Sequence, residues 1–245
     1  MSGVRIGCCG FSVSRKKYYE FFDVVEIQQT FYDIPKIELA RKWRDEAPHG
    51  FEFTIKAWQL ITHPSSSPTY KRLKRELPKD KLKNYGFFKP TDEVFSAWDE
   101  TREFARALGA RIIVFQCPAS FKPTSENKKN LENFFNSIER DEFIFAWEAR
   151  GDWCPDEIKE LCQKLNLIDC VDPFKRREEA GEITYWRLHG KTGYRYKYSD
   201  EELSELLNWV NEKSSNAGFY VMFNNTEMWD DARRFKELTK NRRKI

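Results

Sequence analysis

Short runs along the chain alternate between apolar and polar residues, and each run becomes polar on one face near its end. In the run 51–56, aromatic and aliphatic side chains occupy the odd positions, whereas Glu52, Thr54 and Lys56 occupy the even ones. The same alternation places polar tips on five further runs: Glu26 and Gln28, Gln116, Glu148 and Arg150, Arg187 and His189, and Asn224. Because successive strand side chains point to opposite faces, each run predicts a strand with one apolar face and one face that turns polar.

Predicted strands alternate with predicted helices along the whole chain. The strands are expected at 4–9, 24–28, 51–56, 111–116, 142–148, 167–170, 183–189 and 218–224. The helices are expected at 14–22, 36–47, 91–108, 124–138, 155–165, 199–213 and 226–239, and the segment 171–182 holds at most a poor helix. Eight such units in 245 residues favour an α/β fold, a single closed (β/α)8 TIM-type barrel spanning 1–245.

The connection 57–90 is much longer than the roughly 2–6 residues of an ordinary strand-to-helix loop. We interpret it as an insertion after the third strand. In such a barrel the carboxyl ends of the strands meet at one mouth, where active sites are found. The insertion is therefore expected to act as a lid or a binding loop above the polar strand tips.

Composition narrows the class of protein. Hydrophobic residues make up 40% and aromatic residues 16%, which supports a large core, and the 33% of charged residues is typical of a thermophile or a soluble enzyme. A net charge of +3 is not that of a dedicated nucleic-acid binder, but it permits an anionic substrate. With no signal-peptide pattern and no apolar run of about 20 residues, we expect a cytoplasmic protein without a membrane partner.

The six cysteines contain no CxxC pair, which disfavours a zinc ribbon or a thioredoxin-type site. Reduced core thiols are expected in a mesophile, whereas two of the six could pair in a hyperthermophile.

Several motifs at the predicted strand ends resemble a known family. They are 25–32 (VEIQQTFY), 53–57 (FTIKA), 61–63 (ITH), 115–121 (FQCPASF), 147–150 (WEAR), 186–190 (WRLHG) and 223–226 (FNNT). In this order they are similar to the YecE-like family, the domain-of-unknown-function family numbered seventy-two. The resemblance covers almost the whole chain and implies a TIM-type barrel with its motifs at the strand ends. It brings no established reaction with it.

Four residues are candidates for catalysis: Lys56, Glu26, Glu148 and His189. A lysine at a barrel mouth can form a Schiff base if burial lowers its pKa, or it can bind phosphate as a cation. Glu26 and Glu148 could act as a general acid and base. Purely structural ion pairs remain an alternative, either between Lys56 and these glutamates or between Glu148 and the nearby Arg150.

The candidates for substrate binding surround the same mouth: Arg150, Arg187, Gln116, Asn224, Asn225, Tyr32, His63 and Lys191. Loops after the last two strands of such barrels often bind phosphate, so an anion is expected near Arg187, Lys191 and 224–226. No cofactor is expected. A divalent metal on Glu26, Glu148, Asp169 or Asp172 remains open.

The stretch 70–89 interleaves eight lysines and arginines with four aromatic residues. This pattern suits single-stranded nucleic acid, and it equally suits a charged surface whose aromatic rings pack beneath a lid. Two hypotheses follow. The first is an enzyme acting on an anionic, phosphate-bearing substrate, with a nucleic-acid hydrolase or lyase as one version. The second is a non-catalytic nucleotide or nucleic-acid binding protein.

Overall fold

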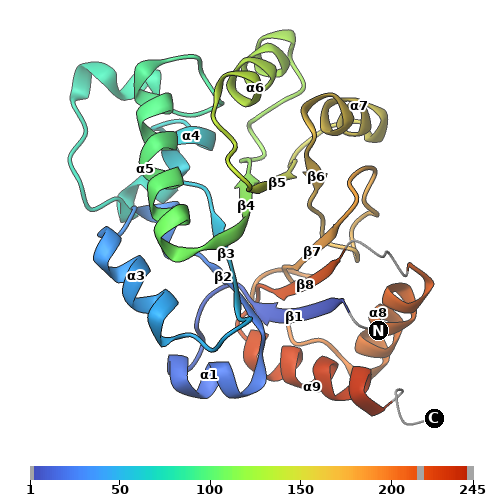
Figure 1. The fold of residues 1–245 in the computed structure, drawn as a ribbon. Coiled ribbons are helices and arrows are strands. Elements are labelled where there is room, and N and C mark those ends of the chain that lie inside the picture. Colours follow the sequence, from blue (N-terminus) through green and yellow to red (C-terminus); the bar gives the residue numbers. More distant parts are fainter. Residues whose placement is uncertain (1–2, 214–217, 242–245) are drawn as a thin grey trace.

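In the computed structural model, which describes residues 3–213 and 218–241, parallel strands surround a central axis and helices lie outside them (Figure 1). The strands are β1 (Val4–Cys8), β2 (Val24–Ile27), β3 (Glu52–Lys56), β4 (Ala110–Gln116), β5 (Ile144–Glu148), β6 (Ile168–Asp169), β7 (Thr184–Leu188) and β8 (Phe219–Phe223). Their order in the sheet is β6-β5-β4-β3-β2-β1-β8-β7. The predicted TIM-type barrel is therefore confirmed.

The barrel closes between β6 and β7 through a single parallel bridge, Val171 to Trp186. The amide of Arg187 donates to the carbonyl of Val171 at 2.8 Å, and the amide of Val171 donates to the carbonyl of Tyr185 at 3.3 Å. β6 itself has only two residues, so this bridge supplies the contact that a longer strand would provide.

The helices follow the predicted positions, with small shifts at their ends. They are α1 (Arg15–Phe21), α3 (Ile37–Glu46), α5 (Asp92–Leu108), α6 (Ser125–Ser137), α7 (Pro155–Leu165), α8 (Asp200–Glu212) and α9 (Met228–Asn241). Gly109 ends α5 with a left-handed φ of 64°, and Ser199 and Glu202 form the expected capping box of α8. Two one-turn helices, α2 (Gln29–Tyr32) and α4 (Gln59–Thr62), were not predicted.

The segment after β6 forms a loop instead of a helix. Arg176 reaches back to Asp169 with both terminal nitrogens, at 2.5 Å and 2.6 Å, and the amide of Glu179 also donates to that carboxylate. Asp169 is fully buried, so its charge requires these donors. The loop therefore folds around a buried carboxylate.

Side chains of the strands alternate between two cores, as predicted: one lies between the barrel and the helices, and the other lies inside the barrel. Apolar side chains on the outer faces pack against the helices, as Phe53, Ile55 and Phe115 do. A smaller apolar cluster fills the barrel interior and includes Val24, Ile112, Val114 and Met222. Polar inward-facing side chains lie in the upper interior, toward the carboxyl ends of the strands.

One of these polar groups is an arginine between two glutamates. Arg187 on β7 donates to both carboxylate oxygens of Glu26 on β2, from Nε at 3.0 Å and from Nη2 at 2.7 Å, and its Nη1 donates to Glu148 on β5. Tyr185 adds a hydrogen bond to Glu26 at 2.9 Å. We call Glu26, Arg187 and Glu148 the buried triad. It ties three strands together across the barrel.

Replacing Arg187, the central charge of the triad, tests how much the triad contributes to the stability of the fold. We expect Arg187→Met to lower the free energy of unfolding by about 3–5 kcal/mol, because two buried carboxylates lose their shared partner. Urea denaturation measures this change. The matched control is Arg5→Met at the amino end of the barrel, where Arg5 pairs with Glu52 at 2.6 Å and is one-third exposed. There we expect a loss below about 1 kcal/mol. Equal losses in the two variants would contradict the central role of the triad.

Candidate functional site

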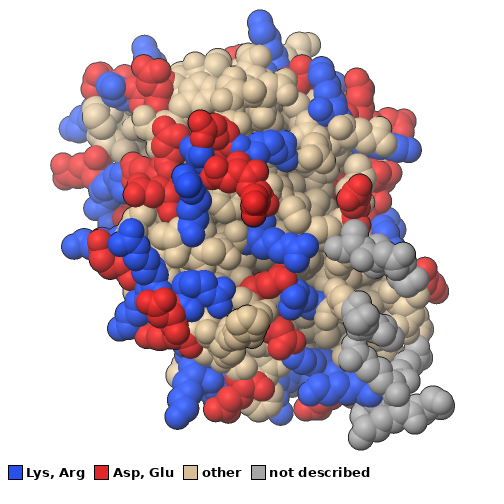
Figure 2. All heavy atoms as spheres, viewed as in Figure 1, with Lys and Arg blue, Asp and Glu red and all other residues tan. Residues whose placement is uncertain are grey.

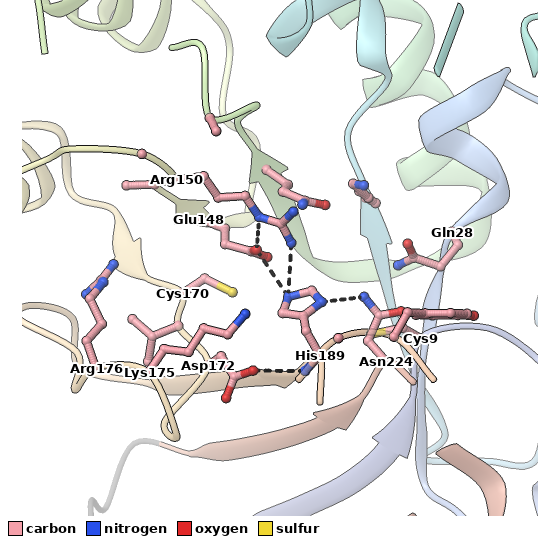
Figure 3. Close-up of a pocket in the computed structure, with 18 of the residues that line it drawn as sticks. Cys9, Gln28, Glu148, Arg150, Cys170, Asp172, Lys175, Arg176, His189 and Asn224 are labelled. Atoms are coloured by element: carbon pink, nitrogen blue, oxygen red, sulfur yellow. Dashed lines mark hydrogen bonds and ion pairs between the residues drawn. The ribbon is translucent and has the colours of Figure 1, made fainter. Parts of the chain in front are cut away.

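A cavity of about 940 Å³ opens at the carboxyl ends of the strands (Figure 3). We call it the mouth cavity. Its walls come from strand ends and from the loops that follow β3, β4, β5, β6 and β7. The charged side chains that line it are Lys56, Arg72, Glu148, Arg150, Asp172, Lys175 and Arg176. Five of these seven are basic, which makes the cavity suitable for an anion.

The structure brings seven of the twelve predicted site residues into this lining: Tyr32, Lys56, Gln116, Glu148, Arg150, His189 and Asn224. They come from different strands, as expected for a barrel mouth. Five others lie outside the lining: Glu26, His63, Arg187, Lys191 and Asn225. The roles of all twelve in binding or catalysis stay predictions.

Glu26 and Arg187 lie below the mouth cavity, with both side chains fully buried in the triad. Glu26 pairs in register with Thr54, which places it one inward position beneath Lys56. Neither side chain lines the mouth cavity, and their predicted parts in catalysis and substrate binding stay predictions. They support Glu148 from below.

The three remaining residues have other contacts. His63 is buried against Phe31, and burial together with the nearby Lys56 lowers its pKa to about 3. Asn225 donates to Asp231 at 2.7 Å beside the start of α9. Lys191 is exposed and pairs with Glu202 at 2.9 Å. Because each of these groups already has partners away from the cavity, direct contact with a ligand in the mouth cavity is not supported.

Glu148 connects the triad to the cavity surface. Its Oε1 accepts from Arg150 Nε at 2.8 Å and lies 3.1 Å from His189 Nε2 (Figure 3). Burial alone would raise the pKa of Glu148, but the charges of Arg150 and Arg187 hold it well below the usual range. Glu148 is therefore a carboxylate, and the predicted ion pair with Arg150 is present.

The contacts of His189 define its tautomer. The side-chain amide of Asn224 donates to Nδ1 at 3.1 Å, so we assign the ring proton to Nε2, which lies 3.1 Å from Glu148 and also 3.3 Å from Nη2 of Arg150. Burial lowers the pKa of His189 despite the nearby carboxylate. A neutral imidazole therefore lines the cavity. Its backbone amide donates to Asp172 at 3.0 Å, which ties the strand end to the loop after β6.

Lys56 lines the cavity without a carboxylate partner. Within the described part of the chain its amine forms no ion pair and lies 3.4 Å from the centre of the Phe31 ring. Burial lowers the pKa of Lys56 well below that of a free lysine, and the charge of Arg187 adds to this effect. The two glutamates are already matched by Arg187 and Arg150, so the site does not need a charged Lys56 to balance it.

Sequence reasoning missed several lining residues, above all Arg72, Lys175 and Arg176, and proposed Asp172 only as a metal ligand. Burial raises the pKa of Asp172, whose carboxylate accepts two backbone amides. The sequence does contain a pattern from which Lys175 and Arg176 could have been predicted. The segment 171–182 follows a predicted strand and lacks a helix pattern, so it had to be a mouth loop. No comparable pattern distinguished Arg72 from its basic neighbours.

The aromatic residues of the stretch 70–89 pack inward. Tyr85 and Phe88 are buried, Phe87 packs on the core, and Tyr70 donates to the carbonyl of His63 at 2.9 Å. Gly86 allows this close approach, with φ at 79° and no room for a Cβ beside His63. These rings are not available as a stacking surface for bases. Figure 2 likewise shows basic and acidic side chains intermingled over the face it displays.

Two further kinds of chemistry were considered from the sequence. Among residues 3–213 and 218–241, no group of three or more His, Cys, Asp and Glu side chains could hold a metal ion. All six cysteines are free, and burial raises the pKa of Cys9 and Cys170, which line the cavity, well above the usual range. Burial therefore disfavours the thiolate form of both, which is the nucleophilic form of cysteine. Across the described helices, none combines the length and apolar character needed to cross a bilayer.

Comparison with solved structures places this fold among known barrels. A protein of the DUF72 family from Thermotoga maritima superimposes with a TM-score of 0.72 at 22% identity, over 97% of this chain and 99% of that one. An L-ribulose 3-epimerase superimposes with a TM-score of 0.61 at 14% identity, over 98% and 96% of the two chains. At these identities the likeness shows the fold alone.

Sequence comparison gives the family. The UPF0759 protein YunF of Bacillus subtilis (strain 168) is 22% identical over 266 residues, covering 93% of this chain and 86% of that protein. A family model described as "Protein of unknown function DUF72" matches residues 13–245. This range takes in all but the first strand of the barrel, and the chain therefore belongs to the DUF72 family.

Proposed function

We propose that the protein is an enzyme that forms an imine between Lys56 and a small anionic carbonyl compound, such as a phosphorylated aldehyde or ketone. The observation that carries this proposal is the Lys56 amine itself, which lines the cavity without a carboxylate partner and has a strongly lowered pKa. A neutral amine is the nucleophilic form of lysine.

The surrounding charges support an anionic substrate. Arg72 and Lys175 line the mouth cavity, and neither side chain forms a hydrogen bond or an ion pair within the described residues. Arg72 is instead placed over the Tyr32 ring at 3.4 Å, which orients the guanidinium while its N–H donors remain free. A phosphate accepts such donors in a bidentate manner. The anion is therefore assigned to the side of the cavity formed by Arg72 and Lys175.

Imine formation needs proton transfer as well as a nucleophile. The amine of Lys56 attacks the carbonyl carbon and a C–N bond forms. The nitrogen loses two protons and the oxygen gains two, so the C–O bond breaks, water leaves and a C=N bond remains. His189 and Asp172 both line the cavity, one as a neutral ring and the other as a carboxyl with a raised pKa. Groups of this kind can give and take protons. Glu148 is assigned the role of orienting His189.

Reductive trapping tests the nucleophile. Incubation with glycolaldehyde phosphate or glyceraldehyde 3-phosphate and sodium cyanoborohydride should leave a stable secondary amine on Lys56, detected by peptide mass spectrometry. Lys56→Gln should lose this adduct, because Lys56 is buried whereas Lys175, the other lysine that lines the cavity, is exposed. The matched control is Lys71→Gln, an exposed neighbour of Arg72 outside the cavity lining. Equal labelling of Lys56 and surface lysines in the wild type would refute the imine.

The pH dependence of trapping tests the electrostatics. Only the neutral amine attacks, so the trapping rate should rise with pH and level off well below pH 10.5, the ordinary pKa of lysine. Glu148 raises the pKa of Lys56, so Glu148→Gln should move the rising part of the profile to lower pH. Initial rates at a series of pH values measure both effects. A wild-type profile that still rises at pH 10 would show that burial leaves Lys56 an ordinary lysine.

A further inference from the structure

A second hollow lies beside the mouth cavity, over the loop after β6. It has a volume of about 320 Å³ and shares Lys175 and Arg176 with the mouth cavity. We call it the side groove. Its remaining lining is Pro173, Phe174, Arg177, Lys191, Glu205 and Trp209. Four basic side chains and one acidic side chain thus line the side groove, although Arg176 already pairs with Asp169 and Lys191 with Glu202.

Arg177 is the distinctive group of the side groove. Its guanidinium lies 3.7 Å from the centre of the Trp209 ring, and Trp209 in turn packs on Phe174 at 5.0 Å. Glu205 and Glu212 attract Arg177 at longer range, but neither forms an ion pair with it. Within the described residues its side chain forms no hydrogen bond either. The aromatic rings therefore position a cation whose N–H donors are unused.

Other arginines that lie over rings show that this is not the general rule in the molecule. Arg44 and Arg140 donate to backbone carbonyls, Arg75 pairs with Asp33 and Glu100, and Arg233 pairs with Glu237. Arg72 and Arg177 are the exceptions in the described part of the chain. Both line these adjacent hollows, Arg72 in the mouth cavity and Arg177 in the side groove.

We infer that the side groove is a second anion subsite, which takes the distal phosphate of a substrate that carries two anionic groups. This inference rests on the proposed function, because the first anion is assigned to Arg72 and Lys175 in the mouth cavity. Lys175 lines both hollows and joins the two subsites. Arg177 then serves as a specificity-determining residue that discriminates bisphosphates from monophosphates.

Binding of non-reactive probes separates this inference from the imine chemistry. We propose isothermal titration of the wild type with the monophosphates and bisphosphates of propane-1,3-diol, pentane-1,5-diol and hexane-1,6-diol. At least one bisphosphate should bind about 10-fold more tightly than its monophosphate, because one additional charge-assisted contact forms. Arg177→Gln should remove that difference while monophosphate affinity stays within about 2-fold of the wild type. Arg177→Lys, which retains the charge, should recover part of the difference.

Arg233→Gln is the matched control, since Arg233 also lies over a tryptophan ring but lines neither hollow. It should keep the full preference, and thermal unfolding of each variant establishes that it is folded. Equal affinities for all monophosphates and bisphosphates would overturn the second subsite but leave the proposed function intact. Absence of any phosphate binding would remove the proposed anion site itself. Tighter binding of a ten-nucleotide single strand than of every bisphosphate would overturn the assignment to a small substrate.

Discussion

The candidate site depends on the way one buried arginine satisfies two glutamates. Arg187 lies inside the barrel with no solvent contact and donates to Glu26 on one side and to Glu148 on the other. An isolated charge at this depth would be costly, so the group persists only because each carboxylate has a geometrically matched donor. The triad also connects β2, β5 and β7, strands that are not neighbours in the sheet. The same contacts therefore satisfy the two buried glutamates and hold the three strands together.

This arrangement determines the state of the groups above it. Arg150 caps Glu148 from the cavity side, so the two glutamates and the two arginines balance each other. Burial and the positive charge of Arg187 disfavour an ammonium on Lys56, and they outweigh the attraction of Glu148 and Glu26, so the pKa of Lys56 is lowered. The Phe31 ring would attract a cation, but it attracts an amine N–H as well and does not replace the lost water. A lysine close to two glutamates thus forms no ion pair with them among the described residues, and its lowered pKa is what the proposed imine formation requires.

The alternation of residues in strands predicted which side chains face the barrel interior, but it could not predict their depth. Glu26 and Gln28 share a face, yet Glu26 lies in the buried triad and only Gln28 lines the mouth cavity. The difference follows from strand register, which places Glu26 level with Thr54, and register depends on contacts distant in sequence. The missing information on depth also explains why the positions of Arg187 and Glu148 were not distinguished. Both were expected at the mouth, and the structure separates them into a supporting group and a lining group.

The loops contribute cavity-lining residues that the strand pattern could not predict. Strand ends contribute the amine, the imidazole and a carboxylate, each oriented by contacts within the barrel. The side chains left free to meet an anion, Arg72 and Lys175, come from the two long irregular connections after β3 and β6. Aromatic rings orient Arg72 without using its donors, whereas a carboxylate would have neutralised it. The high aromatic content noted in the sequence therefore contributes to more than the core, because rings can hold a cation in place and still leave it able to bind.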